Sequence, residues 1–527
     1  MAVAGAGSST WAPLRAGLFR TLWIAAFASN VGTWMQTVGA QWLLVGVPHA
    51  AILVALVQTA TGLPAVLFAL VGGVLADIFD RVKLLVVVLA CMTAAAAALT
   101  ALTALHRMPP ALLLLFTFVL GTGSVLVLPA YQSLVPDMVP REQVPNAAAL
   151  NSISINLARA IGPAVAGLMI AKIGVAAVFA VNAAALLVYA VVVAAHPRLG
   201  GGWESGERFL PAWRAGERYV RNAPVERRIL LRAALFLVPA SSLWALLPLI
   251  ATRRLAVGSG GYGLLLGALG VGAIGGAMLL PRARARLSMN AMTAASSLLF
   301  TAVLVVVVLS RSLALTVAVL LLAGVAWTTF LSNVNAALQL FLPRWVRARG
   351  LAVYQMVLFG GQAAGALLWG LLADAAGLVP AFLASAAVLA AGAATIRFWP
   401  FLQTATIDRS LVRWPEPQLL ATIDPGRPVL VRTTYTVATG RQQQFLQAMA
   451  HLRVSRQRTG ATSWELYQDA QNPCLFIELF TVSSWEEHLQ QHRERQTGAD
   501  LQYHDAAAAL SDPEPQITHY LAVGVGP

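Results

Sequence analysis

Long runs of apolar residues alternate with short polar segments along most of the chain. Each run is close to the ~20 residues that an α-helix needs to cross the hydrocarbon core of a bilayer. Twelve such runs predict twelve membrane-spanning helices: Phe19–Val45, Ala51–Ala76, Leu84–Leu105, Pro110–Leu134, Asn146–Ile173, Val175–Ala195, Ile229–Ala251, Gly261–Leu280, Ala291–Leu309, Ser312–Phe341, Gly350–Ala373 and Pro380–Phe398.

The spacing of these runs divides the membrane part into two six-helix halves, residues 1–195 and 229–400. A basic polar loop, residues 196–228, separates them, and Leu210–Tyr219 within it is predicted to form an amphipathic helix. The loops Leu134–Arg141 and Leu342–Arg349 place Pro and Arg at corresponding points of the two halves. Repeated halves around a central site are typical of transporters.

The pattern changes after residue 400, where a proline-containing linker, residues 401–429, leads into a polar region, residues 430–527. Strand-like and helix-like periods alternate there in the order β-α-β-β-α-β, which predicts a soluble ferredoxin-like α+β domain. The expected elements are Val431–Val437, Gln442–Arg458, Ser463–Tyr467, Cys474–Thr481, Ser483–His492, Asp500–Leu510 and Ile517–Ala522. The fold class is therefore an all-α membrane protein with a soluble C-terminal domain.

Composition agrees with a lipid environment. The chain is 58% hydrophobic and only 11% charged, whereas a soluble protein has about 25% charged residues. The net charge of +14 resides in short loops, which excludes a nucleic-acid-binding face. The two cysteines, Cys91 and Cys474, lie in different contexts and support neither a disulfide framework nor a metal site. We expect no cofactor.

Arginine and lysine concentrate on one side of the predicted spans. The rich side includes Arg81, Lys83, Arg141 and the arginines of the basic loop, and such loops face the cytoplasm. An even number of spans then places both termini in the cytoplasm. The predicted location is the plasma membrane or cell inner membrane, as a multi-pass protein in the lipid bilayer.

The loop after the second predicted span resembles a signature of the major facilitator superfamily, Gly-x-Leu-Ala-Asp-Arg-x-Gly-Arg. Gly73, Asp77 and Arg81 match it together with Leu75 and Ala76, whereas Ile78 and Asp80 depart from it. The resemblance implies that Asp77 acts as a gate by facing the positive N-terminus of the eleventh span, near Gly350. The alternative is a solvated loop acid.

The fifth span resembles a motif of the superfamily's exporters, which implies export in preference to import. Gly162, Pro163 and Gly167 match that motif, and Arg159 precedes them. The alternative is a helix-packing face with a proline kink. Because charges inside a membrane span are costly, Arg159 is expected either to attract an anionic substrate or to pair with an acid.

Amide side chains recur within the spans and are candidates for lining a cavity that holds a polar substrate. The alternative is that they hydrogen-bond neighbouring helices to one another. The candidates are Asn30, Gln36, Gln41, Gln58, Asn151, Asn156, Asn333, Asn335, Gln339, Gln355 and Gln362. Aromatic residues that either stack on a substrate or anchor the spans are Trp34, Trp42, Tyr131, Trp244, Trp327 and Tyr354.

The segments Leu134–Gly167 and Leu342–Asp374, together with the tail, resemble the transmembrane secretion effector branch, to which enterobactin exporters belong. The tail itself is similar to dimeric α/β-barrel domains of the antibiotic-biosynthesis-monooxygenase type. That similarity implies a homodimer through the tail and a pocket lined by Trp464, Asn472, Trp485 and His488. A docking or dimerising module is the alternative to an enzyme.

These features predict a secondary active transporter, not an enzyme, that exports a small organic molecule such as a siderophore, drug or secondary metabolite. No phosphate-binding loop is found, which argues against ATP hydrolysis. The resemblance implies an antiporter driven by a proton gradient. The first span has no carboxylate, so Asp77 and Asp374 are the acids nearest the membrane. A membrane-tethered enzyme and a substrate-gathering scaffold stay as alternatives.

Overall fold

The structure is a computed structural model that describes residues 11–196, 222–343, 346–401, 408, 410–417 and 424–523. At positions 69, 70, 73, 74, 76–78, 348 and 349 only the backbone is described. The chain divides into two compact units, the helical bundle and a unit that contains the tail, and each is considered by itself. The predicted amphipathic helix Leu210–Tyr219 lies outside the described residues.

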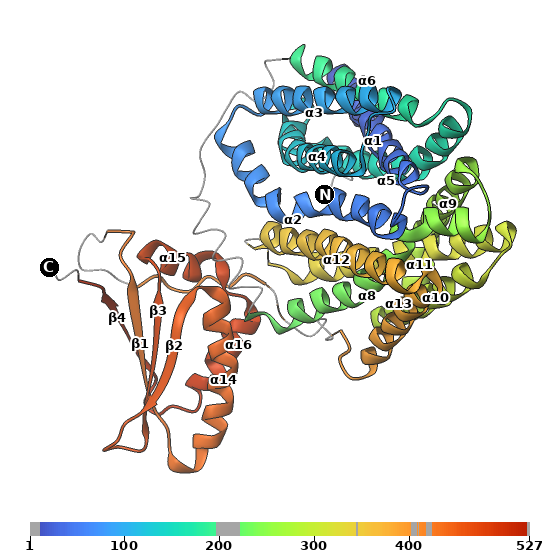
Figure 1. The fold of residues 1–527 in the computed structure, drawn as a ribbon. Helices are drawn as coiled ribbons and strands as arrows, with labels where there is room; N and C mark the ends of the chain where they lie inside the picture. Colours follow the sequence, from blue (N-terminus) through green and yellow to red (C-terminus); the bar gives the residue numbers. More distant parts are fainter. Residues whose placement is uncertain are drawn as a thin grey trace, which may run out of the picture. The chain divides into compact units, whose positions relative to one another are not determined.

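Six helices form the first half of the bundle (Figure 1). They are α1 (Gly17–Leu43), α2 (Ala50–Ile78), α3 (Arg81–Ala104), α4 (Pro110–Met138), α5 (Val144–Lys172) and α6 (Val175–Ala194). Helix α2 packs on α4, α3 packs on α4 and α6, and α1 packs on α5 and α6.

Another six helices form the second half. They are α8 (Pro224–Leu249), which continues into a π-helical turn (Ile250–Arg254), α9 (Ser259–Arg286), α10 (Met289–Leu309), α11 (Leu313–Phe341), α12 (Arg347–Ala376) and α13 (Leu378–Ala394). Stacked and tilted aromatic rings of Phe236, Trp327 and Phe330 join α8 to α11 in its core.

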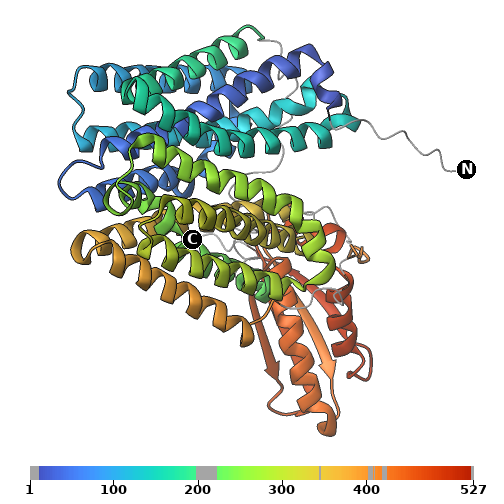
Figure 2. The same ribbon diagram turned by 90° about the vertical axis from the view of Figure 1, so that its right-hand side faces the viewer.

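The two halves touch along α5 with α9 and along α2 with α12. Glycines permit the close approach: a Cβ at Gly167 would lie 2.6 Å from the carbonyl oxygen of Ser259, and one at Gly370 would lie 2.4 Å from the Cβ of Ala55. These two contacts lie near the turn between α1 and α2, and further contacts reach the middle of the helices, where a Cβ on Gly360 would lie 3.2 Å from a methyl carbon of Val66. Figure 2 shows the two halves as stacked layers of helices.

Polar contacts reinforce this end. Gln41 of α1 accepts a hydrogen bond from the Tyr262 hydroxyl at 2.6 Å and donates to the carbonyl of Trp244 at 3.3 Å. His49, just before α2, lies 2.7 Å from a carboxylate oxygen of Asp374 in α12. One end of the bundle is therefore closed by packing, hydrogen bonds and an exposed His–Asp contact.

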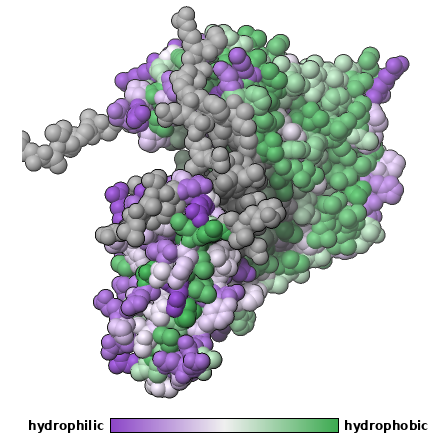
Figure 3. Space-filling model, turned by 90° about the vertical axis from the view of Figure 1, so that its left-hand side faces the viewer, coloured by the Kyte–Doolittle hydropathy of each residue, from purple (hydrophilic) through white to green (hydrophobic). Residues whose placement is uncertain are grey.

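Among the described residues, eleven helices are long and apolar enough to cross a membrane. Helix α1 is not among them, although it runs for 27 residues, because polar side chains lower its hydropathy. The twelve-span count therefore stays a prediction. Figure 3 shows a broad apolar surface on the helical part. Large apolar side chains of the bundle, such as Leu67, Val87 and Leu115, are exposed. Lipid is the solvent that suits such a surface.

The tail is a small antiparallel sheet with helices on it. Its elements are β1 (Val429–Thr436), α14 (Gln442–Thr459), β2 (Ala461–Gln468), β3 (Leu475–Val482), α15 (Trp485–Gln490), a π-helical turn (Gln491–Arg495), α16 (Gly498–Ala508) and β4 (Gln516–Leu521). The strand order is β2-β3-β1-β4, and every neighbouring pair is antiparallel. Side chains of β1 alternate between buried and half-buried, as the sequence period predicted.

Part of the expected linker, residues 401–429, is built into the tail. Leu411 forms a β-bridge with Thr497. The Trp414 amide donates to the carbonyl of His492 at 2.9 Å, and Glu416 pairs with Arg493 at 2.7 Å. The described stretch 410–417 is therefore part of the folded tail and not a flexible linker. Its backbone forms hydrogen bonds with the tail, and the Trp414 ring packs against His492.

Candidate functional site

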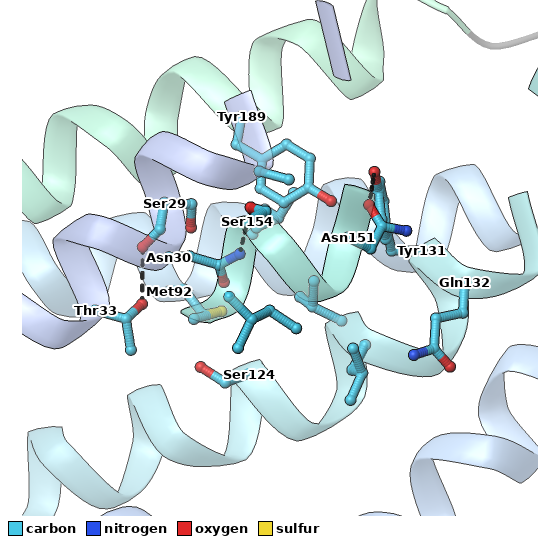
Figure 4. A pocket seen from close by; sticks show the side chains of 15 residues that line it. Ser29, Asn30, Thr33, Met92, Ser124, Tyr131, Gln132, Asn151, Ser154 and Tyr189 are labelled. Atoms are coloured by element: carbon cyan, nitrogen blue, oxygen red, sulfur yellow. Dashed lines mark hydrogen bonds between the residues drawn. The ribbon is translucent and has the colours of Figure 1, made fainter. Parts of the chain in front are cut away.

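A cavity of about 110 Å³ lies inside the first half of the bundle (Figure 4). Helices α1, α3, α4, α5 and α6 all contribute to its wall. The lining side chains belong to Ala26, Ser29, Asn30, Thr33, Leu89, Met92, Ser124, Val127, Leu128, Tyr131, Gln132, Asn151, Ser154, Ile155 and Tyr189. The wall is mixed, with hydroxyls and amides set among apolar side chains, as suits a polar organic ligand.

The polar groups of this wall are partly engaged with one another. Asn30 donates a long hydrogen bond of 3.4 Å to the Ser154 hydroxyl, and the Tyr131 hydroxyl donates to Asn151 at 3.2 Å. The hydroxyl of Thr33 donates to the carbonyl of Ser29 in its own helix. These bonds hold the side chains in place while each amide keeps further hydrogen-bonding capacity for a ligand.

Arg159 lies one helical turn beyond the cavity. It follows Ile155 by four positions on α5, and Trp34 follows Asn30 by four positions on α1, so both stay on the cavity's side of their helices. The guanidinium carbon of Arg159 lies 5.3 Å from the centre of the Trp34 ring. No acid forms an ion pair with Arg159 within the described part of the chain, and its Nε has no hydrogen-bond partner there.

The motif residues near Arg159 serve contacts between helices. Gly162 packs against α1, where a Cβ would lie 2.8 Å from that of Trp34. Gly167 packs on α9 of the other half, against Ser259 and Gly263. Pro163 and Arg159 line a narrow gap toward Trp244 and Trp327 of the second half. The motif therefore lies at the joint between halves, next to the cavity.

Several amides predicted to line a cavity instead join helices. Gln36 accepts from Asn182 of α6, and Asn333 donates to Thr293 at 3.1 Å and to Met289 on α10. Gln362 donates to the carbonyl of Leu358 in its own helix. Burial decides these outcomes, since Gln36 and Asn333 are almost fully enclosed and must satisfy their amides within the protein.

The cavity therefore brings together three of the amide and aromatic candidates, Asn30, Tyr131 and Asn151. Gln58, Asn335 and Gln355 are not part of its lining. Sequence reasoning missed Ser29, Thr33, Ser124, Gln132 and Ser154. A signal existed for some of them, because Ser29 with Thr33 and Asn151 with Ser154 repeat small polar side chains at helical spacing.

The predicted gate is only partly described. At Gly73 and Asp77 only the backbone is described, so the position of the Asp77 carboxylate is not. Arg81 donates to the carbonyl of Ser133 at the end of α4 at 3.3 Å. Asp80, a departure from the superfamily signature, caps α3 by accepting from the Lys83 amide at 2.9 Å. The loop is thereby fixed to its own half.

A buried carboxylate, Glu226 of α8, lies close to the start of α12, and the sequence did not reveal it as a candidate. Glu226 is fully buried, and neither of its oxygens has a hydrogen-bond partner in the described residues. A Cβ placed on Gly350 would lie 2.8 Å from one of these oxygens. Glu226 is also the third residue of α8. It therefore lies at the N-terminal ends of two helices, where an acid interacts favourably with the helix dipoles.

The tail contains a second cavity, of about 330 Å³. Trp414, Pro415, Pro417, Val431, Arg456, Phe480, His488, His492, Ile517 and His519 line it. Of the four side chains expected in a tail pocket only His488 is among them. Trp464 donates to Glu478 at 2.9 Å, Asn472 accepts from the Cys474 amide, and Trp485 packs beside the ring of His488.

Charges near the tail cavity are compensated. Glu478 is fully buried and accepts from Arg456 at 3.2 Å and from the Tyr435 hydroxyl at 3.1 Å. Burial opposes the Arg456 charge, but Glu478 outweighs it and raises the pKa of Arg456 above its ordinary value. Burial lowers the pKa of His488 to about 3 and that of His519 to about 4, so both rings are neutral at pH 7.

Two packed halves of apolar helices, with a polar cavity inside the first half and a charged residue at the joint between the halves, are the architecture of a membrane transporter of the major facilitator type. The sequence profile of the transmembrane secretion effector family matches residues 8–525, and the protein belongs to that family. The match includes the tail.

Related proteins agree with this class. The staphyloferrin A transporter of Staphylococcus aureus is 23% identical over 278 residues, which is 52% of this chain and 70% of that protein. The enterobactin exporter EntS of Shigella boydii is 29% identical over 262 residues, 49% of this chain and 62% of that protein. The chain thus spans less than two thirds of EntS.

Solved structures show the same fold. The nucleoside transporter NupG superposes with a TM-score of 0.60 at 11% identity, covering 73% of this chain and all of that one. A bacterial homologue of the human lysosomal transporter Spinster, inward-facing and occupied, gives a TM-score of 0.59 at 16% identity, covering 74% and 97% of the two chains.

Proposed function

We propose that the protein exports a small polar organic molecule by alternating access, with the cavity of the first half and Arg159 as its substrate site. The observation that carries this proposal is the Arg159 guanidinium at the joint between halves, which has no ion-pair partner among the described residues and lies one helical turn beyond the polar cavity of the first half. An uncompensated charge in the bundle is costly unless it serves a ligand. A ligand with a carboxylate or phenolate would supply the missing counter-charge.

A siderophore is the substrate class that fits best. The relatives named above are a staphyloferrin A transporter and an enterobactin exporter, and siderophores are anionic molecules rich in oxygen. The amides and hydroxyls of Asn30, Ser154 and Asn151 would bind such oxygens, and Arg159 would attract the charge.

The contacts between the halves suggest the conformational steps of the proposed transport cycle. With the orientation predicted from the arginines, the turn between α1 and α2 faces outward, and both termini are cytoplasmic. The described conformation would then be closed to the outside. Export requires these contacts, Gly167 on α9 and His49 with Asp374, to separate while the halves close at the other end. Asp77 is proposed to take part in that second closure.

The proton gradient is the proposed energy source, with Glu226 as the proton carrier. Burial favours the neutral acid, whereas the N-termini of α8 and α12 favour the carboxylate. A movement of α12 relative to α8 would therefore change which form is stable, which links protonation to conformation.

The tail is proposed to be a ferredoxin-like module that pairs with a second copy and gathers substrate for the transporter. Its exposed edge strands, β2 and β4, are available for pairing. The named relatives are transporters, and the proposal gives the tail no catalytic step.

Replacing Arg159 by glutamine tests the substrate site. Metabolites retained by cells that lack the protein first identify the substrate, and its uptake into inverted vesicles is then measured. We expect the Arg159→Gln apparent half-saturation concentration to rise roughly tenfold or more, because a hydrogen bond to a charged group contributes about 1.5–3 kcal/mol.

Arg107→Gln is the matched control, since Arg107 is exposed between α3 and α4, and it should leave the half-saturation concentration unchanged. Equal values for Arg159→Gln and the wild type would contradict a substrate contact. Loss of the inserted protein would indicate instead that Arg159 has a structural role, such as its contact with the Trp34 ring.

A further inference from the structure

Three histidines converge at the tail cavity from two separate elements. His488 lies in α15 and His492 one turn later in the π-helical turn, so both project from the same helical face. His519 comes from β4. One ring nitrogen of each lies within 4.8 Å of the corresponding nitrogens of the other two.

The hydrogen bonds of the first two rings fix which nitrogen is available. The Nδ1 of His488 lies 3.0 Å from the amide oxygen of Gln491, whose own nitrogen reaches Thr459. The Nδ1 of His492 lies 2.8 Å from the carbonyl oxygen of Pro415. Each Nδ1 therefore carries the proton and donates it to an oxygen, which leaves Nε2 with its lone pair. This is the usual way in which protein oxygens orient metal-binding histidines.

A second observation, separate from the spacing of the three rings, indicates that His488 binds a ligand. Its side chain is 2% exposed and lines the cavity, yet its Nε2 has no hydrogen-bond partner in the described residues. A buried acceptor without a donor costs free energy. The cost is recovered if the lone pair binds a metal ion.

We propose that His488, His492 and His519 bind a divalent transition-metal ion of the Zn²⁺ type and leave one coordination position open to the tail cavity. Three neutral imidazoles without a thiolate are a donor set that suits Zn²⁺ and its neighbours in the first transition row. Bonds of about 2.0–2.1 Å require the nitrogens to lie about 3.4 Å apart. The most widely spaced pair of nitrogens therefore closes in by up to about 1.4 Å on binding.

The cavity defines what the open position takes. Three protein ligands and an open fourth position distinguish sites that hold an exchangeable ligand from closed structural sites. The Arg456 guanidinium lines the same cavity, and Trp414 and Phe480 provide aromatic walls. Glu478 already neutralises part of the Arg456 charge, so a cation and the guanidinium can share the cavity. The fitting ligand is a small anion with an aromatic or apolar body.

Metal titration of the whole protein tests this site. The full-length chain is purified in detergent with a tag that contains no histidine and is stripped with a chelator. Zn²⁺ is then titrated by calorimetry, and Co²⁺ by its visible absorption, which reports the coordination geometry. We expect one ion per chain, and we expect His519→Gln and His492→Gln each to lower the affinity by about 100-fold or more, since even second-shell changes cost 10–100-fold.

His451→Gln is the matched control, because His451 is exposed on α14 and outside the cluster, and it should bind as the wild type does. Two variants are used so that a folding defect in one does not decide the result. The absence of stoichiometric binding in the wild type would overturn the proposal. Binding of unchanged affinity in both cluster variants, or a loss in the control, would also overturn it.

Discussion

Replacing Glu226 by glutamine should abolish gradient-driven export while the protein still inserts. Glutamine has nearly the same shape, and Glu226 makes no hydrogen bond in the described residues that the change would break. It cannot exchange a proton at neutral pH. If Glu226 couples the gradient to the movement of α12, efflux should fall about tenfold or more, a factor that corresponds to about 1.4 kcal/mol in the barrier.

Transport measured with and without a pH gradient distinguishes a loss of proton coupling from a loss of substrate binding. Substrate transport is followed in vesicles with and without an imposed pH gradient, at equal protein level. Wild-type transport should respond to the gradient, whereas Glu226→Gln should transport at one low rate in both conditions. Downhill exchange of substrate, which needs no proton, should survive. Glu142→Gln changes an exposed acid and should behave as the wild type. A full response to the gradient in Glu226→Gln would remove Glu226 from the coupling mechanism.

Introducing valine at Gly167 should prevent the closed end of the bundle from forming. A Cβ there would lie 2.6 Å from the Ser259 oxygen and 2.7 Å from the Gly263 Cα. Both are backbone atoms, so relief requires the two helices to separate and not a side-chain adjustment. Because the proposed cycle needs this contact to form once in each turnover, we expect efflux to be lost and the halves to remain apart at this end.

Spin labels at Leu168 and Leu264 report the separation of α5 from α9. Both side chains are exposed, and the native Cys91 and Cys474 are first replaced by serine. The distance between labels should increase in Gly167→Val. The control is Gly275→Val, also on α9, where a Cβ meets nothing within 4 Å, and it should leave the distance unchanged. An unaltered distance together with normal efflux in Gly167→Val would show that this contact is not part of the cycle.

In the tail, local sequence patterns predicted the strands and helices but not every segment that belongs to the domain. Alternation of apolar and polar residues predicted β1, and helical periodicity predicted α14 (Gln442–Thr459), each within two residues of its observed ends. Local patterns did not reveal that the stretch 410–417 belongs to the same domain. Its proline content indicated a linker, but Trp414 and Pro415 close the tail cavity through contacts with residues about 80 positions later, as the Pro415–His492 bond shows.

For the amides of the bundle, the sequence did not predict which side chains line the cavity. Asn30 and Gln36 lie in one helix and are chemically alike, yet Asn30 lines the cavity and Gln36 bonds Asn182 of α6. Six residues apart on α1, they point in different directions and meet different neighbours. A sequence reveals that a span carries amides, but the rotation of each helix in the bundle decides which of them face a ligand.

The sequence by itself determined the long apolar helices of the bundle and the order of elements in the tail, because these depend on local periods. In lipid every backbone group must be satisfied within its own segment, so an apolar run of sufficient length becomes a helix whatever surrounds it. Only the tertiary structure placed Arg159 at the joint between halves, Glu226 at two helix N-termini, and His519 beside His488. Each of these placements depends on a contact between segments that are far apart in the chain. The hydrophobic periodicity within one segment carries no information about such a contact.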